Sequence, residues 1–304
     1  MTDFIGDIHG HAEMLKALLT KMGYEKKNGA FCHSERKVVF VGDYIDRGPA
    51  IRETLQIIRA MVDADQALAI MGNHEYNALC FHFQERDGGG HLRKHLIKNI
   101  IQHYETLKQF QNRQSEYEEY LDWFLTLPLY IETEQFRAVH ACWDINNIDY
   151  LDRRLQKGCL NDELIYEAAI HGDPLNIAVE ETLKGKEMKM PVGTYFSDKE
   201  GTKRTEFRTK WWEDPAAATY RSISVENITT LPDQRIDAKN FRKNHHYGEE
   251  EKMVFFGHYW LSGPPYFFRH NVCCLDYSVA KNGHLVSYRL GDEKILDKNN
   301  LVYV

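Results

Sequence analysis

The chain has 304 residues, of which 43% are hydrophobic and 27% are charged, and its net charge is −7. This length and apolar content can fill the core of one large domain or two ordinary ones, and no apolar run reaches the roughly 18 residues of a transmembrane helix. The mild acidity argues against extended nucleic-acid binding, which rewards a basic surface, but it allows a locally positive site for a phosphate group.

The first third of the chain alternates predicted strands with predicted helices. Apolar, β-rich runs at 4–5, 37–41 and 67–71 each end in a polar loop, and helical spacing of apolar residues follows at 14–22 and after Pro49. Three strand–loop–helix units in succession imply a parallel sheet with right-handed crossovers.

The middle of the chain carries two predicted insertions. Residues 91–127 show helical apolar stripes with a polar break at 111–115. We expect an insertion of about 82–127 to form a helical cap over a functional site rather than a helix that binds a partner. The second insertion, about 145–250, is expected to shape substrate specificity and contains a helical pattern at 163–183.

Strand-like runs also occur in the rest of the chain. They lie near 129–131, 136–140, 253–256, 272–277 and 284–289. Mixed strand and helix patterns of this kind predict an α/β (α+β) fold.

Polar side chains gather in the loops that follow five of the predicted strands. Ligand sites in open α/β sheets lie just outside the carboxyl ends of the strands, so we expect these loops to converge on one crevice. The residues are, in chain order, Asp7 and His9, Asp43 and Asp46, Asn73 and His74, His140, and His258.

The side chains in these loops are carboxylates, imidazoles and an amide, with no thiolate. Such ligands suit Mn²⁺, Fe or Zn²⁺, and one carboxylate shared by two ions would hold them roughly 3.5–4 Å apart. None of the six cysteines is spaced Cys-x-x-Cys, and the adjacent Cys273 and Cys274 are predicted to be core residues. Any one such loop is usually a turn whose polar side chain forms hydrogen bonds within the protein. Five such loops together favour a metal site.

These loops carry recognisable motifs. They are Gly6-Asp7-Ile8-His9-Gly10, Gly42-Asp43-Tyr44-Ile45-Asp46-Arg47-Gly48, Gly72-Asn73-His74-Glu75, Val139-His140 and Gly257-His258. Together they resemble the signature of calcineurin-like metallophosphoesterases. More narrowly, they resemble the phosphoprotein phosphatase branch, which includes bacterial serine/threonine phosphatases and diadenosine tetraphosphatases. The resemblance implies a four-layer α+β sandwich, with central mixed sheets flanked by helices, built as a single catalytic domain over residues 1–304.

The resemblance also implies a ligand set for two divalent metal ions. Mn²⁺ is the first expectation, and Fe, Zn, Ni or Co are the others. The implied ligands are Asp7 and His9 for the first ion, Asp43 as the bridge, and Asn73, His140 and His258 for the second. A hydroxide shared by the ions would attack phosphorus in line.

Three further residues gain catalytic roles from the resemblance. His74 would be the general acid that protonates the leaving oxygen, and Asp46 would orient it. Arg47 would clamp phosphate, because its planar fork binds two oxygens at once. Asn73 would contact substrate as well as metal, and Glu75 would fix the geometry of the loops.

The chain departs from related patterns at two places. Many nucleases and phosphodiesterases of the wider family end in Gly-His-x-His, whereas Trp260 stands at the position of that second histidine, which disfavours a nuclease. The Ser-Ala-Pro-Asn-Tyr segment of eukaryotic serine/threonine phosphatases is absent. Leu275-Asp276-Tyr277-Ser278 stands in its place, so specificity for protein substrates is in doubt.

A second phosphate-binding arginine is expected between His140 and His258. The candidates are Arg204, Arg208 and Arg221. Arg208 is singled out because Trp211 and Trp212 beside it could wall a pocket or stack a base, although they could equally be packing residues. For the histidines without a partner at ligand spacing, including His103, a surface position is expected.

The leading hypothesis is a two-metal phosphoesterase that cleaves phosphomonoesters, including phosphoproteins, small phosphoesters and nucleotides. The alternative is a hydrolase of dinucleoside polyphosphates such as diadenosine tetraphosphate. The alternative from outside the enzymes is an inactive metal-binding module of the same fold. The first residues lack the features of a signal peptide, so we expect a cytoplasmic protein without membrane partners.

Overall fold

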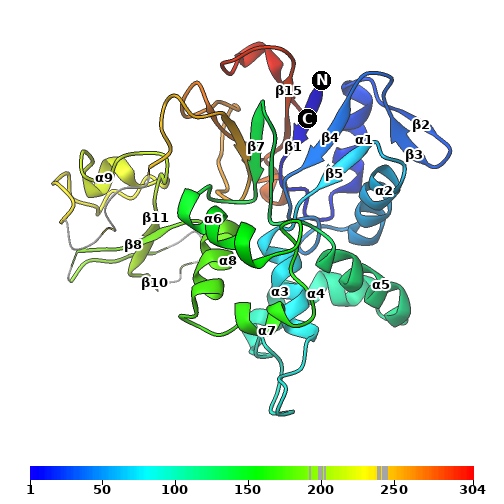
Figure 1. Ribbon diagram of the computed structural model, residues 1–304, viewed down its shortest axis with the longest axis horizontal. Helices are drawn as coiled ribbons and strands as arrows, with labels where there is room; N and C mark the ends of the chain where they lie inside the picture. Colours follow the sequence, from blue (N-terminus) through cyan, green and yellow to red (C-terminus); the bar gives the residue numbers. More distant parts are fainter. Residues whose placement is uncertain (192, 198–200, 202, 238–240, 242–245) are drawn as a thin grey trace.

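Two β-sheets form the centre of the computed structural model, which describes all residues except 192, 198–200, 202, 238–240 and 242–245 (Figure 1). The larger sheet has the order β14-β15-β1-β4-β5, with β16 paired to β15. Its strands are β1 (Thr2–Ile5), β4 (Lys37–Phe40), β5 (Ala67–Ala69), β14 (Asp276–Tyr277), β15 (His284–Leu290) and β16 (Leu301–Tyr303). The smaller sheet has the order β13-β12-β7-β6. Its strands are β6 (Tyr130–Glu132), β7 (Phe136–Val139), β12 (Met253–Phe256) and β13 (Val272–Cys274).

Three short strand pairs and a set of helices surround these sheets. The pairs are β2 (Glu25–Lys27) with β3 (Ala30–Cys32), β8 (Glu187–Lys189) with β11 (Glu206–Arg208), and β9 (Phe196–Ser197) with β10 (Lys203–Arg204). The helices are α1 (Ala12–Lys21), α2 (Ile51–Asp63), α3 (Asn73–His82), α4 (Ile97–Gln109), α5 (Gln114–Leu125), α6 (Ile145–Arg154), α7 (Leu164–Ala168), α8 (Pro174–Lys184) and α9 (Tyr220–Ile223). Within the described ranges, none of them is long and apolar enough to cross a membrane.

The two sheets pack face to face because side chains alternate along each strand. Phe4 on β1 points to the smaller sheet, where its ring stacks on Phe255 of β12 with centroids 3.8 Å apart. Its neighbour Ile5 points the other way, into a cluster with Leu15 of α1 and Leu55 of α2. One face of the larger sheet therefore meets the smaller sheet, and the other face is covered by helices (Figure 1). The predicted α/β fold of mixed sheets flanked by helices is confirmed.

Strand direction brings the polar loops together. β1, β4 and β5 run parallel to one another in the larger sheet, and β7, β12 and β13 do so in the smaller one. The segments that follow β1, β4, β5, β7 and β12 are the five loops singled out in the sequence. The carboxyl ends of both parallel sets contribute to the same crevice, because side chains from all five loops are in contact there.

Some helix boundaries differ from the prediction. Residues 91–96 are not helical, and α4 begins only at Ile97. The expected helix over 163–183 is divided into α7 and α8, because the Asp173 carboxylate accepts from the Leu175 N–H as an N-cap and Pro174 opens a new helix. The short polar pairs β8–β11 and β9–β10 were not predicted.

The tryptophan pair after β11 belongs to the core. Trp211 and Trp212 are 4% and 0% exposed, and both rings pack against Phe256 on the face of β12 that points away from Phe4. Cys273 and Cys274 are also fully buried, as predicted. The structure therefore favours the packing interpretation of the tryptophans over the base-stacking one.

Candidate metal centre and active site

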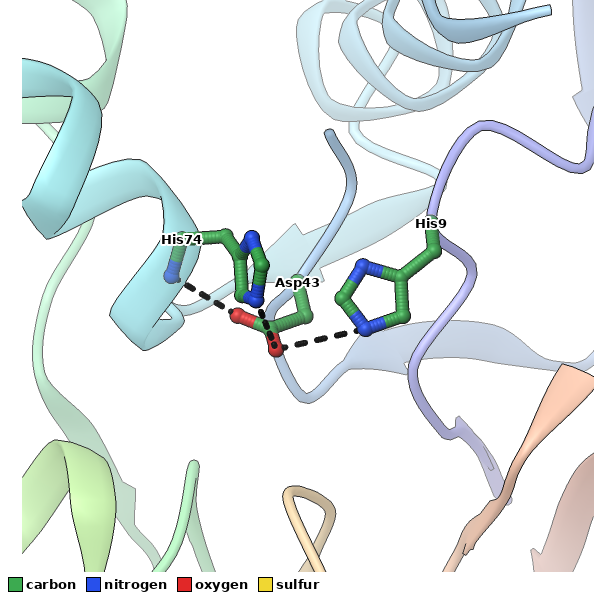
Figure 2. Close-up of side chains that lie close together, drawn as sticks. All are labelled: His9, Asp43 and His74. Carbon is green, nitrogen blue, oxygen red and sulfur yellow. Dashed lines mark hydrogen bonds and ion pairs between the residues drawn. The ribbon is translucent and has the colours of Figure 1, made fainter. Parts of the chain in front are cut away.

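The Asp43 carboxylate lies at the centre of the crevice, with an imidazole on each side. Its Oδ2 is 3.5 Å from Nε2 of His9, and its Oδ1 is 3.3 Å from Nε2 of His140. Figure 2 shows His9 approaching Asp43 from the loop after β1 and His74 approaching it from the first turn of α3, with Nε2 of His74 3.9 Å from Oδ2. All four side chains are almost completely buried.

Asn73 joins the histidines of the last two loops. Its Oδ1 lies 2.7 Å from Nδ1 of His258 and 3.1 Å from Nε2 of His140. Two three-residue groups are close enough to hold a metal ion: His9, Asp43 and His74, and Asp43, His140 and His258. Asp43 belongs to both groups, as a bridging ligand must.

Two of the site histidines have a buried nitrogen that forms no hydrogen bond with the described residues. Nε2 of His9 and Nε2 of His258 are inaccessible to solvent and form no hydrogen bond. Burial, and the nearby charges of Arg47 and Arg208 respectively, lower the pKa of both imidazoles well below the usual value. Both rings are therefore neutral and keep a lone pair, which is the form that binds metal.

Three carboxylates are buried together at this site. Asp7 accepts the His258 N–H, and burial together with Asp276 and Asp43 raises the pKa of Asp7 well above its usual value. Asp43 behaves differently, because His140 and His74 outweigh the effect of burial and hold its pKa well below the usual range. Buried carboxylates beside unpartnered imidazoles fit divalent cations, which supply the missing positive charge.

Asp276 is a site residue that the sequence analysis missed. Its carboxylate accepts the backbone N–H of Trp260 at 2.7 Å and that of Ser278 at 2.9 Å. It follows β13, a parallel strand, so the carboxyl-end argument that selected the other five loops also applied to it.

The loops adopt unusual backbone conformations. Six site residues other than glycine have φ between 45° and 72°, a region that L-residues populate sparsely and that is common at functional sites. They are His9, Asp43, Asp46, Arg47, His258 and Trp260.

Glycines in the motifs permit close backbone contacts. A Cβ on Gly72 would lie 2.2 Å from the Asp43 nitrogen, and one on Gly257 would lie 1.8 Å from Asp7 Oδ1. Glu75, at the start of α3, accepts the N–H groups of Gly72, Asp43 and Tyr44 at 2.8–3.0 Å, so one side chain fixes two of the loops.

Asp46 and His74 form a hydrogen-bonded pair beside the metal centre. Asp46 Oδ2 lies 2.5 Å from His74 Nδ1, and Oδ1 lies 2.7 Å from Nδ1 of His103 and 2.6 Å from the Thr106 hydroxyl. The expectation that His103 is a surface histidine is wrong. It is 4% exposed, because α4 inserts it between Asp46 and the hydroxyl of Tyr117, 2.8 Å from its Nε2.

Two arginines predicted to bind phosphate reach the same region. The Arg47 guanidinium contacts Nε2 of His74 at 3.3 Å and stacks on the Trp260 ring, 3.8 Å from its centroid. Arg208 donates to the His258 carbonyl at 3.4 Å. It lines a cavity of about 380 Å³ whose wall also contains Asn73 and His258.

A family profile described as calcineurin-like phosphoesterase matches residues 2–259 of this chain. The chain belongs to this family. Its members are hydrolases that act on phosphoester bonds with the help of divalent metal ions. The two groups of buried ligands around Asp43 and the site geometry described above agree with that membership.

Sequence relatives and a solved structure extend this comparison. The chain is 31% identical to a bis(5'-nucleosyl)-tetraphosphatase (asymmetrical), PrpE, of Oceanobacillus iheyensis over 176 residues, which span 57% of this chain and 68% of that protein. It is 28% identical to the protein of the same name from Bacillus subtilis, over 57% of this chain and 70% of that one. A protein serine/threonine phosphatase from Saccharomyces cerevisiae aligns with a TM-score of 0.50 at 12% identity, over all of this chain and 78% of that one, and shows the shared fold.

Proposed function

We propose that this chain hydrolyses dinucleoside polyphosphates at a phosphoanhydride bond, using two divalent metal ions. The observation that carries the proposal is the similarity to proteins named bis(5'-nucleosyl)-tetraphosphatases, over more than half of the chain. These names favour the alternative that the sequence left open over phosphomonoester cleavage, the leading hypothesis.

The residues around Asp43 would hold the two ions. Asp7 and His9 on one side, and Asn73, His140 and His258 on the other, offer the carboxylate, imidazole and amide groups that suit Mn²⁺, the ion we propose. When bound, the ions neutralise phosphate charge and lower the pKa of water that attacks phosphorus.

The remaining site residues would act on the substrate directly. Water adds its oxygen to phosphorus, the bond from phosphorus to the bridging oxygen breaks, and that oxygen keeps the electron pair and takes a proton from His74. Asp46, held at Nδ1 of His74, keeps the opposite nitrogen, Nε2, turned to the leaving oxygen. Arg47 and Arg208 bind phosphate oxygens from two sides of the site.

We assign His74 to proton transfer rather than to metal binding, although it lies within ligand distance of Asp43 and His9. Its Nδ1 is bonded to Asp46, and its Nε2 faces the guanidinium of Arg47 at 3.3 Å. With Nδ1 bonded to Asp46, Nε2 is turned toward the phosphate that Arg47 would hold, which is the position of a proton donor to the leaving oxygen.

The two predicted insertions supply much of the cavity wall beside this site. Arg93 and Gln102 come from the segment 82–127, and Lys184 and Arg208 come from the segment 145–250. This origin supports the proposed roles of the insertions as a cap and as a specificity element.

A substrate panel tests the proposal. The protein, loaded with Mn²⁺ and analysed for metal content, is expected to cleave diadenosine tetraphosphate with a kcat/KM well above those for p-nitrophenyl phosphate and a phosphopeptide. Asp43→Asn is expected to remove both bound metal and activity, and His74→Asn to remove activity while metal stays bound. A higher kcat/KM for the phosphopeptide would reject the proposed substrate, and unchanged activity in Asp43→Asn would reject the site.

A further inference from the structure

The cavity beside the metal centre follows one face of α3. Its wall contains Asn73, Tyr76, Asn77 and Cys80, and the offsets of three, four and seven residues from Asn73 place them on one side of the helix. Because an α-helix rises 1.5 Å per residue, the cavity extends about 10 Å from the ligand Asn73. That length accommodates several phosphate groups of a polyphosphate chain.

Two basic side chains that line this cavity, Lys184 and Arg93, differ in their hydrogen-bond partners. Lys184 already has an acidic partner, since both carboxylate oxygens of Glu180 lie within 2.6 Å of its Nζ. Arg93 has only neutral partners among the described residues: Oε1 of Gln102 at 2.7 Å and Oδ1 of Asn99 at 3.2 Å. The carboxylates of Asp46 and Glu180 act on Arg93 electrostatically but form no hydrogen bond with it. This half-buried guanidinium therefore has donors left for an anion, and a phosphate matches their planar arrangement.

Gln102 connects this arginine to the proton donor of the proposed reaction. Its Oε1 accepts from Arg93, while its Nε2 lies 3.4 Å from Nε2 of His74. The leaving oxygen must lie against that same His74 nitrogen to receive a proton. The phosphate beyond the leaving oxygen therefore falls on the side of Gln102 and Arg93.

We propose that the cavity along α3 is the subsite for the leaving nucleotide, and that Arg93 binds its phosphate groups. The inference rests on the proposed function and adds to it. Arg47 and Arg208 hold the phosphate that is attacked, whereas Arg93 recognises the polyphosphate chain behind the leaving oxygen. Arg93 thus distinguishes a phosphoanhydride substrate from a simple phosphomonoester.

The test compares two substrates in one variant. In Arg93→Met, kcat/KM for diadenosine tetraphosphate is expected to fall at least ten times more than kcat/KM for p-nitrophenyl phosphate, whose leaving group carries no phosphate. Arg86→Met is the matched control, because this exposed arginine of the same segment stacks on Tyr166 and does not line the cavity. Its selectivity between the two substrates is expected to equal that of the wild type.

Inhibition provides a second measurement at fixed free Mn²⁺. Tripolyphosphate is expected to inhibit p-nitrophenyl phosphate hydrolysis at least tenfold more weakly in Arg93→Met than in the wild type, while inhibition by orthophosphate stays within twofold. An equal loss on both substrates, or unchanged inhibition by tripolyphosphate, overturns the subsite. If the wild type hydrolyses p-nitrophenyl phosphate but not diadenosine tetraphosphate, the proposed function itself has failed. A wild type that cleaves both, with unchanged selectivity in Arg93→Met, leaves the function standing and removes only the subsite.

Discussion

Nδ1 of His103 lies 2.7 Å from Oδ1 of Asp46, on the side of the carboxylate opposite to His74. The pair joins helix α4 to the loop after β4 across 57 residues of sequence. Asp46 is therefore held through both oxygens, and its position depends on a helix that contributes no metal ligand.

Removing the His103 imidazole tests whether its contact with Asp46 positions the catalytic pair. His103→Phe is expected to lower kcat about tenfold with little change in KM, because Asp46 loses a partner and orients His74 less well, and a well-placed general acid contributes roughly 10²–10⁴-fold. Tyr117→Phe, which removes only the hydroxyl behind His103, is expected to have a smaller effect. Steady-state kinetics with phenyl phosphate, whose leaving oxygen needs a proton, measures both, and a rise in KM at constant kcat would contradict the positioning role.

The second prediction concerns the ring beneath Arg47. Trp260 lies 3.8 Å from the guanidinium, and such a contact contributes about 0.5–2 kcal/mol. Trp260→Ala is expected to raise KM and the inhibition constant of orthophosphate by roughly 2–30-fold, because Arg47 is less well held in its phosphate-binding position. Trp260→Phe keeps an aromatic face and should lie between the two. The interpretation fails if the inhibition constant for orthophosphate is the same in all three proteins.

The third prediction concerns a glycine that contacts a ligand. In Gly257→Ala the new Cβ would lie 1.8 Å from Asp7 Oδ1, so the carboxylate must move. A shift of about 1 Å in a catalytic site can reduce the rate by about 10²-fold, and we expect that loss together with a lower metal content. Gly90→Ala is the control, since its Cβ would meet only Glu85, at 3.8 Å. Elemental analysis and activity measure the pair, and full metal occupancy in Gly257→Ala would count against the close contact.

The fourth prediction concerns stability and pH. Asp144 caps α6 by accepting the N–H groups of Asn146 and Asn147, and it forms an ion pair with Lys186. Burial raises the pKa of Asp144, but Lys186 and the two N–H groups outweigh it, and the net pKa lies below the usual value. A depressed pKa in the folded state stabilises the protein above the unfolded pKa of about 3.9, and this contribution disappears as the pH falls through the folded value.

Asp144→Asn keeps a side chain that can cap α6 but loses the negative charge. It therefore isolates the contribution of the ion pair with Lys186 to the free energy of unfolding. The free energy of unfolding at pH 7 is expected to fall by about 1.5–3 kcal/mol, the range for hydrogen bonds to charged groups. In Asp144→Ala, which also loses the cap, the free energy of unfolding should fall by about 1 kcal/mol more. Urea unfolding of the metal-free proteins from pH 7 to pH 3 measures both, and the difference between wild type and Asp144→Asn should shrink below pH 4. A difference that stays constant over this range would exclude the ion pair as its cause.

The parts of the molecule that could be predicted from the sequence are those marked by a pattern within a few consecutive residues. The strands near 37–41 and 253–256 are short apolar runs that end at Gly-Asp or Gly-His, and the structure has β4 and β12 there. The position of the Asp43 loop in the crevice could also be predicted, because the carboxyl ends of parallel strands lie at one edge of a sheet.

Contacts made only by tertiary packing had no such signal. His103 and Thr106 carry no motif, and their role depends on where α4 lies relative to Asp46. Trp211 and Trp212 lie in a basic, aromatic segment that suits base stacking as well as packing, and only the position of Phe256 decides between them. Asp276, by contrast, could have been found, since it follows a parallel strand of the smaller sheet.

The side chains around Asp43 come from both sheets, since Asp7, Asp43 and Asn73 follow strands of the larger sheet and His140 and His258 follow strands of the smaller one. Metal ions in this crevice would act as cross-links between the two halves of the sandwich. Ligands that bind only the folded state stabilise it by about 2.7 kcal/mol at a hundredfold excess over Kd. Loss of the ions would therefore stop turnover and also weaken the association of the two sheets. The supply of metal would then determine how long each molecule resists proteolysis.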